Sequence, residues 1–430
     1  MGTQALSHPP LLRALRRRDL IGFLINTMIG SGMLAGPAKV YGLAGDWSFA
    51  VLGVAALLIA PMILVFADLG SRFTGTGGPY LYVRAALPGW MAFSAGWLLW
   101  ISQAFSTATL SSLLVSYLAG FWPVLGSGLP RTAVLVTLGL TVTYITLRGI
   151  RQSAGTSNLF VVLKVAFIVG FIVAGVAFVQ PARLAIASAA PPPITFAQAI
   201  LIYIYAYTGF ERASVIAGEA KEPQRDVPMA LLAALAIATV AYGGVLLVCL
   251  GVLDNPAAND RPLAEVGRLL FGPAGQAAIS AGACVVVSGT ILVATVGMAR
   301  MLLALSEQGD LPPVFGAVHA SWRTPYVAII VSSSLAFGLA IMSNLITTLT
   351  FSTATRVLCY ILCCVALWRL SRRPDAPAAT FNLPARGVFA FVSAALFAIV
   401  LLLGATKELP ALAAVLAVGL AILGLTRLNR

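Results

Sequence analysis

The chain has 430 residues, of which 60% are hydrophobic and only 10% are charged. This composition excludes a soluble globular domain and is typical of a protein that crosses a lipid bilayer many times. The formal net charge of +13 would suggest a nucleic-acid partner in a soluble protein, but membrane proteins accumulate Lys and Arg in their cytoplasmic loops. We therefore expect a protein embedded in the lipid bilayer, with no nucleic-acid partner.

A short basic arm at residues 1–18 precedes a series of apolar segments with little sequence between them. At ~1.5 Å per residue, about 20 residues cross ~30 Å of hydrocarbon. The segments predict an all-α polytopic membrane protein with 12 transmembrane helices. They are residues 19–44, 47–73, 89–120, 132–148, 156–179, 196–219, 227–253, 276–306, 325–342, 347–369, 385–403 and 409–427.

The distribution of basic residues predicts the orientation. If the N-terminus is inside, the large majority of Lys and Arg residues outside the apolar segments fall on the cytoplasmic side. This is the bias that membrane proteins show. We expect a multi-pass protein of the cell membrane with both its N-terminus and its C-terminus in the cytoplasm.

The first apolar segment is interrupted in its middle by Gly30, Ser31 and Gly32. Unpaired backbone groups in hydrocarbon are costly, so such a break survives where it lines a cavity or binds something. The sixth segment has a second interruption at residues 207–211 (YTGFE). Paired interruptions in corresponding halves of a chain are typical of a transporter's substrate site. The alternative is that the glycines only allow two helices to pack closely.

The two interruptions also predict the organisation of the chain. The first broken segment enters from the cytoplasm and the sixth from outside, so residues 19–179 and 196–369 have opposite topology. Such halves form the inverted repeats of many transporters. The two segments in residues 385–427 are then an addition to a five-plus-five repeat, and residues 1–18 are a cytoplasmic arm.

Four motifs, in order along the chain, resemble the amino acid–polyamine–organocation (APC) superfamily. They are residues 29–37 (IGSGMLAGP), 77–80 (GGPY), 209–211 (GFE) leading to Glu219 and 223–228 (PQRDVP), and 299–312 (ARMLLALSEQGDLP). The resemblance runs from about residue 15 to 372. It implies the LeuT-like fold, in which the first and sixth helices are broken and two helices follow the repeats. It also implies transport of amino acids or their amines.

A free amino acid presents a carboxylate and an ammonium group, and two broken helices can bind both without placing full charges in the membrane. The half-helix after the first break points free N–H groups at the cavity, so we expect Ser31, Gly32 and Met33 to hold the carboxylate. The resemblance implies that carbonyl groups near the second break, with one from the first, bind the ammonium group. These carbonyls belong to Tyr205, Ala206, Thr208 and Ile29.

Two charged residues within the apolar segments are candidates for coupling or gating. Glu211 follows the second break; the resemblance implies a role in gating or proton-linked change, and the alternative is a structural ion pair with Arg212. Lys164 lies in the fifth segment, and the resemblance implies that its ammonium group replaces a sodium ion between the first, fifth and eighth helices. Loss of water makes a charged ammonium costly, which favours proton exchange; the alternative is a permanently charged structural pin.

Arg356, in the tenth segment, neutralises Glu211 or Asp68, touches the substrate, or extends to an interface. Asp68 is expected to pair with Arg72 or Arg84. Hydroxyl side chains in the third, eighth and tenth segments are candidates for side-chain selectivity, although most such groups bond their own helix. They are Ser106, Thr107, Thr109, Ser288, Thr290, Ser352 and Thr353.

These patterns predict a secondary transporter of amino acids that works by alternating access, with proton-coupled symport of a neutral amino acid as the favoured mode. The pocket offers no free carboxylate for a cationic side chain. Rival interpretations are an exchanger or exporter of amino acids or amines and, from other classes, a channel or a membrane enzyme. No charged rings or filter repeat and no Walker-type loop are present. We expect no metal site and no cofactor.

Overall fold

A computed structural model describes residues 15–73, 77–148, 154–215, 217, 220–381 and 383–428, without the side chains of residues 154–159. Residues 1–14 of the expected basic arm and Glu219 of the third motif lie outside these ranges.

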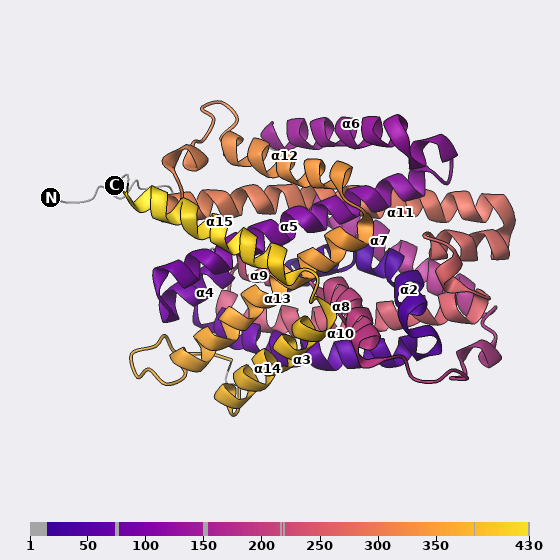
Figure 1. The fold of residues 1–430 in the computed structure, drawn as a ribbon, viewed down its shortest axis with the longest axis horizontal. Helices are drawn as coiled ribbons and strands as arrows, with labels where there is room; N and C mark the ends of the chain where they lie inside the picture. Colours follow the sequence, from indigo (N-terminus) through magenta and orange to yellow (C-terminus); the bar gives the residue numbers. More distant parts are fainter. Residues whose placement is uncertain are drawn as a thin grey trace.

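The described chain is helical throughout, with long helices joined by short connections (Figure 1). The α-helices are α1 (Arg17–Met28), α2 (Ser31–Ala44), α3 (Ser48–Arg72), α4 (Pro79–Ala86), α5 (Gly89–Leu118), α6 (Gly128–Leu147), α7 (Ala154–Val176), α8 (Pro193–Tyr207), α9 (Glu211–Val215), α10 (Pro223–Val252), α11 (Pro262–Glu307), α12 (Tyr326–Met342), α13 (Leu345–Leu370), α14 (Arg386–Gly404) and α15 (Leu409–Leu428). Short 3₁₀ helices are η1 (Gly45–Trp47), η2 (Pro123–Gly126), η3 (Pro181–Leu184), η5 (Pro256–Ala258) and η6 (Pro313–Gly316).

Within the described residues, nine helical segments are long and apolar enough to cross a membrane. Two shorter apolar helices, at Phe160–Val176 and Tyr326–Met342, accompany them. These lengths confirm an all-helical, polytopic membrane protein. Most observed helix ends lie within a few residues of the expected ones, because the apolar stretches that fill the hydrocarbon are also the stretches that form helices.

The first and sixth apolar segments are each divided into two helices, as expected. The first break lies at Ile29 and Gly30, between α1 and α2. The second lies at residues 208–210, between α8 and α9. Both breaks are buried in the protein, which is the condition under which non-helical backbone is tolerated at membrane depth.

One expected helix start is wrong. The sequence started the seventh segment at residue 227, which would make Pro228 one of its first residues, but α10 begins at Pro223 and contains Pro228. Because proline has no N–H group, Pro228 leaves the carbonyl of Gln224 without its helical donor. The hydroxyl of Thr380 donates to that carbonyl at 2.7 Å, so a long-range hydrogen bond keeps the helix intact through the proline.

The eighth segment begins earlier than expected. The apolar pattern started at residue 276, whereas α11 starts at Pro262 and bends sharply at Phe271 and Gly272. Gly272 has a φ of +66°, which glycine adopts at little cost. The short arm before the bend packs back on the long one, since a Cβ atom at Gly267 would lie 2.7 Å from the carbonyl oxygen of Gly275.

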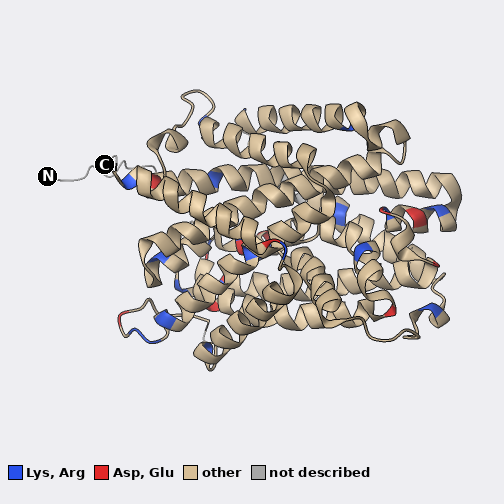
Figure 2. Cartoon of the chain, viewed as in Figure 1, with Lys and Arg blue, Asp and Glu red and all other residues tan. Residues whose placement is uncertain are grey.

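Two helices form the centre of the bundle. α5 packs along α13 and also contacts α11 and α12, and nearly every residue of its middle is buried. α6 and α12 lie side by side along one edge of the view, and α14 and α15 lie on the outside (Figure 1). Charged residues are sparse along the helices and more frequent near their ends and in the connections (Figure 2).

The two ends of the bundle differ. At one end α1 begins and α3 ends; Arg17 bonds Asp226 there, and Arg373 donates to the carbonyl of Ala85. We call this the basic end. The opposite end carries the α2–α3 and α10–α11 connections.

Candidate functional site

The two breaks face each other in the middle of the bundle. The hydroxyl of Thr27, near the end of α1, donates to the carbonyl of Gly209 at 3.2 Å. Gly209 has a φ of +109°, and a Cβ atom there would lie 2.7 Å from the carbonyl oxygen of Thr27. Both the backbone conformation and the close approach therefore require glycine at this position.

Gly32 is a close-packing position. A Cβ atom at Gly32 would lie 2.5 Å from both the Cα and the Cβ atom of Ala206, on α8. The alternative interpretation, close packing of two helices, thus holds for Gly32. Gly30 has more space, with Leu110 at 3.6 Å as the nearest side chain. A bulky residue at Gly32 would separate α2 from α8 and is no clean test of ligand binding.

The first turn of α2 offers free N–H groups. Among the described residues, the amides of Ser31 and Gly32 have no hydrogen-bond acceptor, as expected for the start of a helix. The amide of Met33, in contrast, donates to the carbonyl of Gly30 at 3.2 Å. Of the three expected carboxylate ligands, Ser31 and Gly32 therefore have available amides, and Met33 lies beyond the cavity lining.

Of the carbonyl groups expected to bind an ammonium group, those of Tyr205 and Ala206 already have donors within the protein. The Tyr205 carbonyl accepts from both the amide and the hydroxyl of Thr208, at 3.0 and 2.6 Å. The phenol of Tyr242, on α10, is 2.6 Å from the Ala206 oxygen and 2.9 Å from the Met28 oxygen. One hydroxyl therefore joins the ends of α1 and α8.

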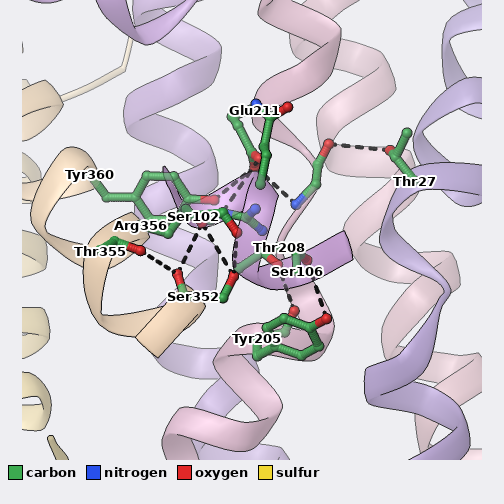
Figure 3. Close-up of polar contacts among 12 residues, drawn as sticks. Thr27, Ser102, Ser106, Tyr205, Thr208, Glu211, Ser352, Thr355, Arg356 and Tyr360 are labelled. Carbon is green, nitrogen blue, oxygen red and sulfur yellow. Dashed lines mark hydrogen bonds and ion pairs between the residues drawn. The ribbon is translucent and has the colours of Figure 1, made fainter. Parts of the chain in front are cut away.

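A small cavity of about 20 Å³ lies between the breaks, which leaves room for roughly one water molecule. The hydroxyl of Tyr205 closes it, at 2.8 Å from the Ser31 hydroxyl and 3.2 Å from the Ser106 hydroxyl (Figure 3). The lining residues are Thr27, Met28, Gly30, Ser31, Gly32, Ser106, Leu110, Tyr205, Ala206, Thr208, Gly209, Arg212, Thr290 and Arg356. The sequence expected Ser31, Gly32, Tyr205, Ala206 and Thr208 at this site.

Lys164 is fully buried at the first break. Its Nζ atom donates to the carbonyls of Asn26 and Ile29, at 2.8 and 2.7 Å, and to the hydroxyl of Thr290 at 3.0 Å. These contacts join α7 to α1 and α11, the three helices that the resemblance indicated. They also occupy the Ile29 carbonyl, which the sequence had assigned to the substrate's ammonium group.

Glu211 is fully buried at the second break. One carboxylate oxygen accepts from the amide of Gly209 at 2.9 Å and from the phenol of Tyr360 at 2.8 Å. The other oxygen lies 3.7 Å from Nε of Arg356 (Figure 3). The alternative partner, Arg212, is not the one observed, because consecutive residues of a helix point in different directions.

The remaining charged groups are placed as follows. Arg356 is 1% exposed, which rules out an extended position at an interface. Asp68 pairs with Arg72, at 2.6 Å, and with Arg386, at 3.3 Å. Arg84 pairs with Asp310 instead. The expected pair of Asp68 with Arg72 is therefore present, and the pair with Arg84 is not.

Most of the candidate hydroxyls bond their own helix. Thr107, Thr109 and Thr353 donate to carbonyls four residues earlier, and Ser352 is bonded to Ser102 across α5 and α13. Only Ser106 and Thr290 line the cavity. Sequence reasoning missed Thr27, Tyr242 and Tyr360, whose only signal was a polar group within an apolar segment.

Each of the four half-helix ends at the breaks has its own kind of partner. A full charge from the chain meets two of them: the ammonium of Lys164 at the end of α1, and the carboxylate of Glu211 just before α9. Among the described residues, no charged group is bonded to the backbone of the other two, which are the first turn of α2 and the last carbonyls of α8. Free N–H groups attract anions and free carbonyls attract cations, so this second pair of ends suits a zwitterion.

Comparison with known proteins gives a family. The family model described as amino acid permease matches residues 15–424. The chain is 28% identical to the methylthioribose transporter of Bacillus subtilis over 417 residues, which cover 89% of this chain and 87% of that protein. It is 29% identical to the branched-chain amino acid permease BcaP of the same organism, over 74% of this chain and 72% of that protein. It is 25% identical to the serine/threonine exchanger SteT, also from Bacillus subtilis, over 84% of each chain.

Proposed function

This chain belongs to the amino acid permease family of the APC superfamily, and from that premise we propose that it carries an α-amino acid through the cavity between the two helix breaks by alternating access. Family membership makes it a secondary transporter of amino acids or related solutes, and not an enzyme. The observation that carries the proposal is the pairing of two half-helix ends that meet no charged group of the chain.

The substrate's carboxylate binds the free amides of Ser31 and Gly32 at the start of α2. Its ammonium group binds the last carbonyls of α8, at Tyr205, Ala206 and Thr208. The carbonyls of Tyr205 and Ala206 now accept from neutral hydroxyl and amide groups, which an ammonium group can replace as the stronger donor. Tyr205 must leave the cavity as the substrate enters, because its hydroxyl occupies the space between Ser31 and Ser106.

The two ends of the bundle support alternating access. At the end opposite the basic end, residues of α2, α5, α6, α12 and α13 and of the connection before α11 line a vestibule of about 1110 Å³. At the basic end, Tyr80 and Arg84 bond Asp310, and Arg17 bonds Asp226. Burial, and after it the hydrogen bond to Asp310, raises the pKa of Tyr80, so its phenol stays a neutral donor. The larger pocket thus lies at one end, and the ion pairs that join the helices lie at the other.

The full topology proposed from the sequence is consistent with this arrangement. It has 12 spans in two inverted repeats, residues 19–179 and 196–369, followed by two further helices, with both termini in the cytoplasm. The basic end is then the cytoplasmic one. α1, α2, α3, α8 and α10 contact one another, as do α5, α6, α11 and α12. We propose that these two groups rock against each other.

Proton coupling is the proposed driving mode, with exchange or export as the alternative. Lys164 supports it, because its ammonium group is the one cation among the described residues that binds the carbonyls of the first break. Loss of its proton would release α1 from α7 and α11. The sequence favours a neutral substrate, since it found no carboxylate for a cationic side chain. The charges that line the cavity also influence which substrate side chain can bind, as described in the next subsection.

The test depends on the α-carboxylate and the α-ammonium group of the substrate. Purified protein is screened for thermal stabilisation by the twenty amino acids and common polyamines, and hits are tested for saturable flux in liposomes. The methyl ester and the deaminated acid of the substrate each remove one charged end. We expect each to bind at least about tenfold more weakly, because a buried partner is then left unpaired. Equal binding of either analogue, or flux of polyamines alone, contradicts the proposal.

A further inference from the structure

Two arginine side chains line the cavity between the breaks: Arg212, from α9, and Arg356, from α13. They are only 7% and 1% exposed. Among the described residues, Nε and Nη1 of Arg212 and Nε and Nη2 of Arg356 have no hydrogen-bond partner. Buried guanidinium groups are normally paired through several of their N–H groups, so these four nitrogens lack the acceptor that their burial demands.

The described part of the chain does not supply that acceptor. Glu211 pairs with one of the two arginines, and one of its oxygens is already used by Gly209 and Tyr360. Its other oxygen is 3.7 Å from Nε of Arg356, an ion pair without a hydrogen bond. With Lys164, three cations accompany one carboxylate around the breaks in the described part of the chain, and arginine does not lose its proton in proteins. An uncompensated buried charge is costly unless something neutralises it.

A neutral amino acid cannot correct this imbalance. Its carboxylate and ammonium charges cancel, so its entry leaves the net charge of the occupied site unchanged. An amino acid with a carboxylate side chain adds one negative charge. It also brings two oxygens that match the planar fork of a guanidinium group.

The vestibule carries the same sign of charge. Its lining includes Lys39, Arg131 and Arg261 but only one carboxylate, Asp260. Lys39 pairs with Asp260 at 2.6 Å, which leaves two arginines in excess. Nη1 of Arg261 has no hydrogen-bond partner among the described residues. A cleft lined by one sign of charge concentrates solutes of the opposite sign, so this vestibule also favours an anion.

We propose that the substrate is an amino acid with an acidic side chain, of the glutamate or aspartate class, whose side-chain carboxylate binds Arg212 and Arg356. This inference rests on the proposed function and replaces the neutral side chain that the sequence favoured. The main-chain groups of the substrate bind the ends of α2 and α8, and its side chain faces α9 and α13.

The test compares each acidic amino acid with its amide, because glutamine and asparagine have nearly the shape of glutamate and aspartate without the charge. Binding is measured by thermal stabilisation and transport by radiolabelled flux in liposomes. We expect glutamate or aspartate to bind at least about tenfold more tightly than its amide, the range for leaving a buried charge without its partner. The series is repeated with gluconate in place of chloride, since a halide on the guanidinium groups would compete.

Arg212→Gln is the informative variant. Arg212 has no ion-pair partner among the described residues, whereas removal of Arg356 would leave Glu211 buried and unpaired. We expect Arg212→Gln to bring the glutamate-to-glutamine affinity ratio close to one without lowering the melting temperature of the substrate-free protein. Arg268→Gln, at an exposed ion pair with Glu265, is the matched control and should keep the wild-type ratio.

The outcomes separate this inference from the proposed function. If neutral or cationic amino acids are transported and the glutamate-to-glutamine affinity ratio is one or less, the inference of an acidic substrate is wrong. The proposed function as an amino acid transporter is then still supported. Stabilisation by chloride alone, with glutamate and glutamine equal, also overturns it. Failure of every amino acid to bind or cross overturns both. If Arg212→Gln leaves the glutamate-to-glutamine affinity ratio unchanged, Arg212 does not bind the side-chain carboxylate of the substrate.

Discussion

The two helix breaks are fixed by opposite charges. At the first break, the ammonium group of Lys164 binds the free carbonyls at the end of α1. At the second, the carboxylate of Glu211 binds the free amide of Gly209 just before α9. In each case the chain supplies the charge that the exposed backbone group attracts. At each break, one helix end is therefore held by a charged side chain of the protein and has a structural role. The other helix end, at the start of α2 or the end of α8, is not bonded to a charged side chain, and we propose that it binds the ligand.

The largest expected effect comes from removing the anion of the second break. Glu211→Ala leaves the Gly209 amide, the Tyr360 phenol and the Arg356 guanidinium without their partner. We expect the free energy of unfolding to fall by about 3–5 kcal/mol, because one member of a buried ion pair is left unpaired. The measurement is unfolding in mixed micelles.

Glu265→Ala is the matched control for that change, since its ion pair with Arg268 lies at the surface. An exposed pair of this kind is worth about 0–1 kcal/mol. Similar losses in Glu211→Ala and Glu265→Ala would show that the second break does not depend on its carboxylate.

Removing the cation of the first break should have a smaller effect on stability and a specific effect on coupling. Lys164→Ala leaves the Asn26 and Ile29 carbonyls without their donor, and we expect a loss of about 2 kcal/mol, the range for a hydrogen bond to a charged group. If Lys164 exchanges the coupled proton, the initial rate of uptake no longer depends on external pH in this variant. Uptake is measured in liposomes across a series of external pH values.

Lys407→Ala, at an exposed position between α14 and α15, controls for the loss of a lysine and should keep the wild-type pH profile. A pH profile that is unchanged in Lys164→Ala, together with a lower melting temperature, would assign Lys164 a purely structural role. The first break would then resemble the second in depending on a fixed charge.

The smallest expected effect concerns the neutral partner that the two breaks share. Tyr242→Phe removes the hydroxyl that lies between the Met28 and Ala206 carbonyls. We expect a loss of about 1 kcal/mol, typical of one neutral hydrogen bond, in the same unfolding assay. Tyr144→Phe, on the exposed face of α6, is the control. If Tyr242→Phe lowers the free energy of unfolding as much as Glu211→Ala does, the distinction between helix ends held by charged side chains and helix ends free to bind a ligand is wrong.

The sequence by itself determined where the helices run and where two of them break. Apolar length gave the helical segments, because hydrocarbon demands internally satisfied backbone. Glycine marked the breaks, and at Gly209 the structure shows the positive φ and close backbone contact that require it. Ser31, Gly32, Tyr205, Ala206 and Thr208 were also expected at the site where the cavity is found.

Only the tertiary structure decided which groups pair across the breaks. Glu211 meets Arg356 and not its neighbour Arg212, and Tyr242 joins two carbonyls that are far from it in the chain. Such pairs depend on the rotation of each helix about its axis and on the packing of α5 and α13 at the centre. Apolar periodicity does not fix that rotation in helices whose faces are nearly all buried. The unpartnered guanidinium groups of the cavity became visible only when those pairs were known.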